Sequence, residues 1–369
     1  MCQFSNNNSS KPTHKKFMKI FKSLSCALIM ACAACSGSSE KGNIVTEVTS
    51  SPIDFGEELV IGNPISMSRN GNLLAINDNK ADSAFHIIDI DQNKYIGQFG
   101  RKGSGPGEFG RLTLISATDE GFIISEPLEH RATTVVVGPQ QLTPTYKPIF
   151  ETETSFWSLE KLANGNYITS EGYVDYPELF KVLSPEGKVV ALTGNRQIPD
   201  NVRNLPNNAV TAAYQYAPYV SPDRKKVLAL GSGEAAGFYK VDGDTLALVA
   251  QFFNPAADGD HNFSDHDYLG LDGKKPMGFV SAAVSDDAVY ILNSELSIED
   301  SMKAGDGNTD YVTGNMIFVY DWSGNLTGKI HTDRRLRHIT PPYEDGKMYA
   351  ITEDGCDPTV VVLNIPLEK

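Results

Sequence analysis

The chain has 369 residues, and its formal net charge at pH 7 is −14. The first 34 residues contain five Lys and no acidic residue, so the rest of the chain is more acidic still. Such a body has no general electrostatic attraction to nucleic acid or anionic lipid, which excludes non-specific nucleic-acid binding. The 32 Gly and 20 Pro indicate many turns rather than a few long helices.

The N-terminus has the pattern of an export signal. Lys19 and Lys22 precede an apolar run over residues 24–31, which is too short to span a bilayer but has the length of a signal-peptide core. Residues 1–17 are polar and precede this complete signal, so Met18 is the expected translation start. Residues 1–34 are therefore predicted to be a signal peptide, and a buried N-terminal helix is the alternative interpretation.

Residues 32–35, Cys-Ala-Ala-Cys, resemble the lipobox of bacterial lipoproteins, in which small residues precede a Cys that is acylated and becomes the new N-terminus. The resemblance implies lipidation at Cys35. Cys replaces the usual Leu at the first position, which leaves Cys32 as the alternative. The lipidated Cys and a flexible tether would then occupy residues 35–51. Ser36 stands where some inner-membrane lipoproteins carry Asp, which favours an outer-membrane anchor facing the periplasm or the exterior.

One sequence unit recurs six times along the rest of the chain. It consists of a polar or Gly-containing turn, an apolar strand and then a carboxylate. Each such strand follows a short strand of small residues and precedes a further apolar run and a second hairpin signal. The strands after the repeated turns begin at Leu73, Phe122, Tyr167, Val227, Val289 and Met348.

Four antiparallel strands in each of six repeats predict an all-β fold, a six-bladed β-propeller over residues 52–369. A two-sheet sandwich is the alternative, but it does not predict six equivalent turns. The sixth repeat stops after its third strand, because the sequence ends at Lys369. Residues 57–61 are therefore predicted to supply the missing outer strand and to close the ring from the N-terminal side.

Long loops are expected on one face of this propeller, at residues 194–216, 254–278 and 293–315. The same face receives the ends of the six strands that follow the repeated turns, and each end carries an acid. A ring of acids at a channel mouth would bind cations or a cationic partner, whereas acids paired with Arg would instead fasten neighbouring blades. The candidate ligand-binding residues on this face are Asp78, Glu126, Glu171, Glu234, Glu295, Glu353, Arg111, Arg131, Tyr173 and Tyr214.

Residues 99–109, FGRKGSGPGEF, resemble the blade junction of NHL-repeat propellers, in which a Gly-rich segment ending in Gly-Glu-Phe leads into the next blade. The chain from the lipobox onward is similar to the TolB-like six-bladed propeller lipoproteins of Bacteroidetes. This resemblance implies the fold and an envelope location. It implies no particular activity, because most members of that group have none assigned.

The sequence offers no catalytic set and no metal site of known pattern. Asp258, Asp260 and Asn262 match the first, third and fifth places of a calcium loop, but Phe263 stands where Gly is needed and Leu269 where Glu is needed. Gluconolactonase-like propellers hold calcium in the channel, which keeps calcium open as a cofactor, although no ligand can be matched by position. No cofactor is otherwise expected.

We therefore expect a lipid-anchored binding module, a monomer that binds an envelope protein, a peptide or a glycan through its long-loop face. It would bind no nucleic acid and would contact the membrane only through its N-terminal lipid. An enzyme is the less favoured interpretation, as a calcium-dependent lactonase-like hydrolase or lyase. A purely structural role is a third alternative.

Overall fold

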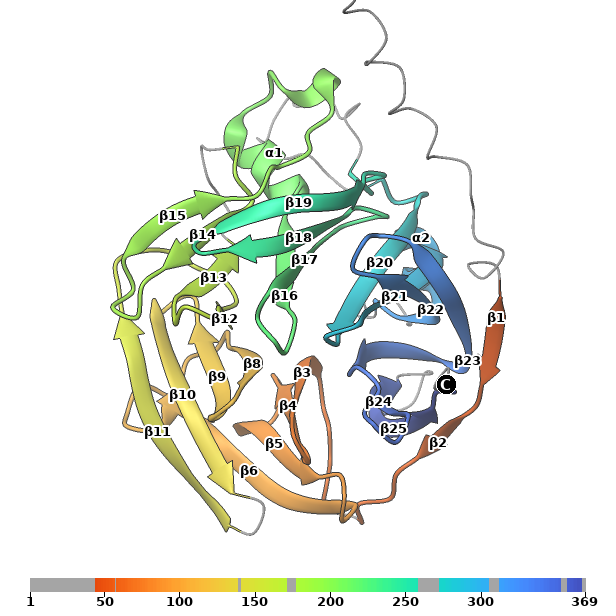
Figure 1. The fold of residues 1–369 in the computed structure, drawn as a ribbon. Coiled ribbons are helices and arrows are strands. Elements are labelled where there is room, and N and C mark those ends of the chain that lie inside the picture. The colour runs from red at the N-terminus through yellow and green to blue at the C-terminus, as the bar shows by residue number, and fades with distance from the viewer. Residues whose placement is uncertain are drawn as a thin grey trace, which may run out of the picture. The chain divides into compact units, whose positions relative to one another are not determined.

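The computed structural model describes residues 44–56, 58–138, 141–170, 177–257, 272–304, 312–352 and 357–366. Glu40–Lys369 is one compact unit, separate from Met1–Ser39. Within this unit short antiparallel sheets are arranged around a central axis (Figure 1), which confirms the predicted all-β propeller. Among the described residues, no helix is both long and apolar enough to cross a membrane.

Blades one and two are separate antiparallel sheets in which the first strand lies closest to the axis (Figure 1). A short strand, β7 (Glu108–Phe109), pairs in parallel with the end of the outermost strand of blade one. The strands of blade one are β3 (Pro64–Asn70), β4 (Leu73–Asp78), β5 (Ser83–Asp89) and β6 (Lys94–Lys102). Those of blade two are β8 (Leu114–Thr118), β9 (Gly121–Glu126), β10 (Arg131–Gly138) and β11 (Gln141–Glu151).

Blades three and four repeat the same order from the axis outward. The strands of blade three are β12 (Glu160–Lys161), β13 (Tyr167–Ser170), β14 (Phe180–Leu183) and β15 (Val189–Thr193). Those of blade four are β16 (Tyr216–Val220), β17 (Lys226–Gly231), β18 (Ala236–Asp242) and β19 (Thr245–Phe252). The connection between the two blades carries a 3-10 turn at Asp200–Val202 and a short helix, α1 (Asn207–Ala213).

Blades five and six share one continuous sheet, because a single long strand belongs to both. The strands of blade five are β20 (Pro276–Val284), β21 (Ala288–Ser297), β22 (Gly314–Asp321) and the first part of β23 (Leu326–Ile339). A short helix, α2 (Ile298–Ala304), follows β21. Residues 336–339 of β23 then pair with β24 (Lys347–Thr352), which pairs with β25 (Thr359–Asn364). Counting β23 in both blades gives the six predicted blades.

The ring is closed by an N-terminal strand, as predicted, but by an earlier one. β2 (Ser50–Pro52) pairs antiparallel with β25 and is the outer strand of blade six. The prediction that residues 57–61 close the ring is wrong. Leu59 and Ile61 instead pack their side chains between blades six and one, without strand pairing.

A second N-terminal strand also joins the propeller. β1 (Val45–Val48) pairs in parallel with residues 329–332 of β23, next to blade five (Figure 1). The propeller therefore begins before residue 52. Residues 45–48 and 50–51 of the predicted tether (residues 35–51) form strands, so the prediction of a tether remains only for the residues before Val45. These two N-terminal strands, β1 and β2, lie on the outer side of blades five and six.

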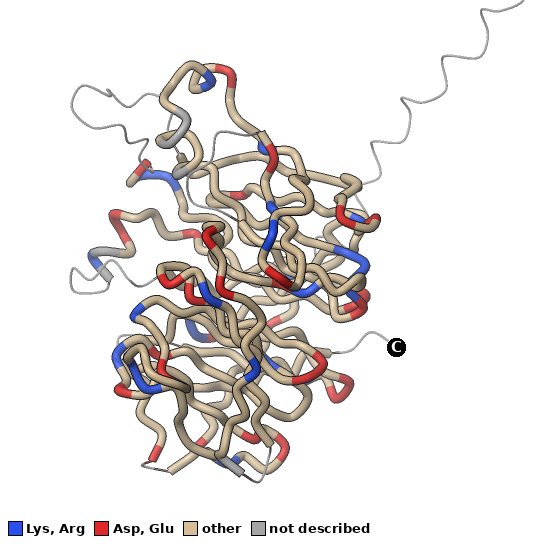
Figure 2. Tube along the Cα trace, turned by 90° about the vertical axis from the view of Figure 1, so that its left-hand side faces the viewer, with Lys and Arg blue, Asp and Glu red and all other residues tan. Residues whose placement is uncertain are grey.

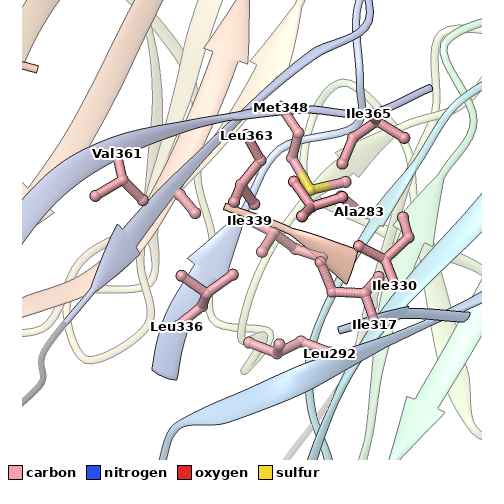
Figure 3. Close-up of a cluster of buried hydrophobic side chains, with 12 residues drawn as sticks. Ala283, Leu292, Ile317, Ile330, Leu336, Ile339, Met348, Val361, Leu363 and Ile365 are labelled. Atoms are coloured by element: carbon pink, nitrogen blue, oxygen red, sulfur yellow. The ribbon is translucent and has the colours of Figure 1, made fainter. Parts of the chain in front are cut away.

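Apolar clusters between neighbouring blades hold the ring together. Met348 and Leu363 of blade six pack with Leu292, Ile317 and Ile330 of blade five (Figure 3). All five side chains are buried, and burying a side chain of this size contributes about 1.5–3 kcal/mol relative to leaving it exposed. Equivalent clusters lie between the other blades, so the core itself fixes the ring.

Candidate functional site

A hollow of about 680 Å³ follows the central axis of the described part of the propeller, and we call it the axial channel. It is lined by the ends of the innermost strands and by the turns that follow them, so it opens on the face of these short turns. This is the face opposite to the predicted long-loop face. Each of the six blades contributes to the wall, for example through Ser68, Ala117, Glu160, Tyr219, Ala282 and Thr340.

Glu160 is a charged residue in the wall of this channel. It belongs to β12, which is only two residues long, and it pairs through its backbone with Ile168 of β13. Among the described residues, no side chain or backbone group hydrogen-bonds to its carboxyl group or forms an ion pair with it. Burial raises the pKa of Glu160 to about 8, because nothing nearby compensates a charge there. A ligand that enters the channel therefore meets an unpaired carboxyl group.

The basic side chains at the channel mouth, unlike Glu160, have partners of their own. The guanidinium of Arg69 lies 3.9 Å from the ring centroid of Tyr343, and its Nε donates to the carbonyl oxygen of Gly71 at 2.8 Å. Arg224 of blade four reaches Asp119 of blade two at 2.6 Å. Both cations are therefore held in place by neighbouring groups, and Arg224 pairs with Asp119 across the opening.

Arg224 has an unusual backbone that places it at the mouth. Its φ is 59°, in the left-handed region where a non-Gly residue is uncommon. Its backbone N–H donates to the carbonyl oxygen of Ser221 at 2.7 Å, which closes the turn between β16 and β17. The turn therefore directs the guanidinium of Arg224 toward Asp119 across the opening.

A smaller hollow of about 260 Å³ lies at the opposite end of the axis. Its wall includes the aromatic side chains of Trp157, Tyr216, Tyr219 and Phe279, from blades three, four and five. Trp157, Tyr216 and Tyr219 come from blades three and four, and Phe279 comes from blade five. Tyr219 borders both hollows, so it stands between the two ends of the channel.

Asp78, the first acid of the predicted ring, is tied into the fold. Its side chain is 1% exposed, and it accepts hydrogen bonds from the backbone N–H groups of Gly62 (2.6 Å), Asn63 (2.9 Å) and Lys80 (2.9 Å). Nε2 of His86 lies 3.3 Å away. Burial would raise the pKa of Asp78, but these hydrogen bonds lower it well below its ordinary value. Asp78 therefore fastens the end of β4 to the segment before β3.

Glu126 occupies the equivalent place in blade two. Its fully buried carboxylate accepts hydrogen bonds from Nε (2.7 Å) and Nη2 (2.8 Å) of Arg131 and from the backbone N–H of Gly110 (2.9 Å). The hydrogen bond with Glu126 raises the pKa of Arg131. Glu126 is therefore paired with an Arg and fastens the chain, which is the alternative interpretation that the sequence left open for these acids.

The other described members of the predicted set do not gather at one place. Glu234 is exposed after β17 and accepts a hydrogen bond from Nδ2 of Asn254 at 3.3 Å. Glu295 is exposed on β21, and Arg111 is exposed before β8. Tyr214 is buried beside Phe253, with ring centroids 6.2 Å apart.

Glu171, Tyr173 and Glu353 lie outside the described residues, and so does Cys35. The described members of the predicted set line neither hollow. A ring of free acids is therefore not formed by Asp78 and Glu126, and ligand binding by the remaining predicted residues stays a prediction.

The long loops differ in how far the structure describes them. The loop at residues 194–216 carries its own apolar cluster, which contains Val202, Val210 and Tyr214 and continues to Ala257. The loop is therefore packed rather than extended into solvent. Residues 258–271, with the calcium-loop-like Asp258, lie outside the description. Among the described residues, no three His, Cys, Asp or Glu side chains gather closely enough to hold a metal ion.

Figure 2 shows Lys and Arg interspersed with Asp and Glu along the side of the chain in view, without a continuous basic area. Sequence reasoning did not single out Glu160, although it placed an inner strand around that residue. The signal available was an adjacent acid and base, Glu160-Lys161, inside a short strand that should otherwise be apolar or small. A solvated strand end produces the same pattern, so the residue types alone did not identify a channel position.

Comparison with known families gives one match that covers most of the chain. The family model described as TolB-like 6-blade propeller-like matches residues 43–341. This range includes Glu160 and the inner strands of all six blades. No curated protein matches the sequence.

Solved structures resemble the propeller at low sequence identity. A Bacteroides fragilis protein provisionally described as exported superposes with a TM-score of 0.55 at 12% identity, covering 88% of this chain and 99% of its own. The propeller domain of Cps50 (Swd1) from Myceliophteria thermophila reaches a TM-score of 0.45 at 9% identity, covering 86% of this chain and 100% of its own. The first likeness concerns the fold alone, and the second is too weak to carry an argument.

Proposed function

This chain belongs to the TolB-like six-blade propeller family, and we propose that it is a binding module of the cell envelope that takes part of its partner into the axial channel. The observation that carries this proposal is the channel itself. Its volume of about 680 Å³ lies within the range of about 300–1,000 Å³ that is usual for ligand sites. All six blades line it, so its wall is fixed by the whole ring.

The envelope location is supported by the N-terminal sequence. The apolar run at residues 24–31 and the Cys-Ala-Ala-Cys segment match an export signal followed by lipidation at Cys35. The Bacteroides fragilis protein with the same fold is described as exported, which agrees with this location. We propose that acylated Cys35 anchors the propeller to the outer membrane, and that the partner is an envelope protein, a peptide or a glycan.

The proposal can be tested by filling the channel. Ala117 lines the channel from β8, so Ala117→Trp would place an indole ring inside it. Val190 is 48% exposed on the outer strand β15, and Val190→Trp adds the same ring at a distance from the channel. The Glu40–Lys369 unit and both variants would be immobilised and exposed to envelope extract, after thermal melting has shown that each is folded.

We expect Ala117→Trp to retain at least tenfold less of each partner than the wild-type unit and Val190→Trp do. Equal retention by all three proteins would contradict the proposal that the partner enters the channel. Retention would be quantified by mass spectrometry against a blank matrix, so that only partners competed by free wild-type unit are counted.

A further inference from the structure

We propose that Glu160 accepts the primary ammonium group of a lysine side chain from the partner, inside the axial channel. This inference rests on the proposed function and specifies the chemistry of the group that enters. The carboxyl group of Glu160 faces a hollow large enough for several side chains, and no described residue pairs with it. An acceptor of this kind needs a donor, and the described residues of the propeller do not supply one.

The charges around the channel favour a cation. The wall carries the acids Asp119, Glu160, Asp286, Asp287 and Glu344 against the bases Arg69, Lys161 and Arg224. Two of the bases are already engaged, Arg69 over Tyr343 and Arg224 with Asp119. The third, Lys161, acts on Glu120, whose pKa is lowered first by Lys147 and then by Lys161. Five acids against three bases leave the wall with a formal excess of negative charge, and a ligand cation would be attracted to it.

The neutral groups near Glu160 suit a slender aliphatic stem that ends in a compact charge. Ala117, Ala282 and Ala283 line the channel among polar residues such as Ser116 and Thr340. Burial raises the pKa of the Tyr219 phenol to about 12, and the nearby carboxylate of Glu160 contributes to the same shift. The Tyr219 hydroxyl also makes a backbone hydrogen bond with Ala282, so it is fixed in place. The four methylene groups of a lysine side chain can lie along these alanines while its ammonium group reaches Glu160.

The pH dependence follows from the same geometry. Burial raises the pKa of Glu160 to about 8, so the carboxyl group is largely neutral at pH 6 when the channel is empty. An ammonium needs the carboxylate, so binding at pH 6–7 would release one proton. The affinity should then rise by about tenfold per pH unit between pH 6 and pH 7.5 and level off above pH 8.

The test uses two small probes with the Glu40–Lys369 unit. Nα-acetyl-lysine methylamide carries the ammonium, and Nα-acetyl-norleucine methylamide has the same stem without the charge. Dissociation constants would be measured by ligand-observed NMR at pH 6, 7 and 8. We expect the lysine probe to bind at least tenfold more tightly than the norleucine probe at pH 8, and this advantage to shrink at pH 6.

The matched variants are Glu160→Gln, which removes the proposed acceptor, and Glu153→Gln, which removes an exposed acid that does not line the channel. Glu160→Gln should weaken the lysine probe at least tenfold and abolish the pH dependence, whereas Glu153→Gln should change the affinity less than threefold. Equal binding of the two probes to the wild type would overturn the inference, and this result does not depend on any variant folding. An unchanged lysine affinity in folded Glu160→Gln would overturn it as well.

These results are separable from those that test the proposed function. If Ala117→Trp loses the envelope partner while Glu160→Gln keeps it, the channel is the site but Glu160 is not its ammonium acceptor. If Ala117→Trp keeps the partner, the proposed function itself fails.

Discussion

Replacing Glu160 with Gln should make the propeller more stable at alkaline pH and leave it unchanged at acidic pH. Gln has nearly the same shape as Glu and cannot ionise. In the wild type, burial raises the pKa of Glu160 from 4.5 to about 8 in the folded state, while the unfolded chain keeps the ordinary value. The two states therefore bind different numbers of protons between these two values.

The direction of the effect follows from which state binds more protons. Below pH 4.5 Glu160 is neutral in both states, and its full contribution to stability is present. As the pH rises, the unfolded chain loses the proton first, so the free energy of unfolding falls until the pH passes about 8. Above that pH the folded protein holds an unpaired buried carboxylate, and the penalty is complete.

The magnitude has a ceiling of roughly 5 kcal/mol, from about 1.4 kcal/mol for each tenfold difference in proton affinity. Because the side chain is partly open to the channel, water screens the charge, and we expect about half of this ceiling. For a chain of this size that corresponds to a melting temperature higher by roughly 3–4 °C in Glu160→Gln at pH 9.

The assay is thermal unfolding of the Glu40–Lys369 unit at pH 5, 7 and 9, with Glu344→Gln as the control. Glu344 is an exposed acid at the channel mouth, so its substitution should shift the melting temperature by less than 1 °C at each pH, or about 0.5 kcal/mol. Parallel melting curves for wild type and Glu160→Gln across this range would refute the reasoning, because they would mean that Glu160 is solvated or paired.

Three other perturbations test the account of the fold and the anchor. Glu126→Gln leaves Arg131 without its buried carboxylate and should cost about 3–5 kcal/mol in urea unfolding, whereas Glu120→Gln, at an exposed pair, should leave the urea midpoint almost unchanged. Deleting residues 1–52 removes β1 and β2 and exposes the edge of β25, so it should lower the melting temperature far more than deleting residues 1–43; equal melting temperatures would show that these strands do not close the ring. Cys35→Ala should leave the propeller folded but move it from the membrane to the soluble fraction, and a variant that still floats with lipid would show that the anchor lies elsewhere.

Local signals predicted most of the fold. The second strand of each blade begins at the predicted residue, as at Leu73 and Tyr167, or one residue before it, because a hairpin is specified by residues that are adjacent in sequence. Gly71 and Gly346 have positive φ in these turns, which is the conformation that Gly permits and other residues rarely adopt. Blade number follows directly from counting such local units.

Ring closure was misplaced because it joins distant segments. Residues 50–52, Ser-Ser-Pro, carry no apolar pattern, and they pair with β25 only because the register of the last blade leaves its edge free. Pro52 is tolerated there because β2 is an edge strand. Leu59 and Ile61 attracted the prediction by being apolar, but their role is to fill the space between blades six and one.

The sequence alone also cannot predict the role of a single acidic side chain. Whether an acid at a strand end is free or engaged depends on which backbone groups and cations the fold brings to it. Glu126 receives Arg131 and Gly110, while Glu160 receives no partner from the described residues. Both are Glu beside a strand in the sequence, so only the three-dimensional arrangement separates the structural acid from the candidate site.

The central claim, that the partner enters the axial channel, is tested most directly by site-specific photocrosslinking in the cells that make this protein. The photoreactive residue p-benzoyl-phenylalanine would replace Tyr343, which is 49% exposed at the channel mouth, and in separate strains Gln215, beside the smaller hollow, and Val190, on the outer strand β15. We predict a discrete adduct from position 343 that is absent from positions 215 and 190. An adduct from position 215 alone would contradict the account and place the partner on the long-loop face.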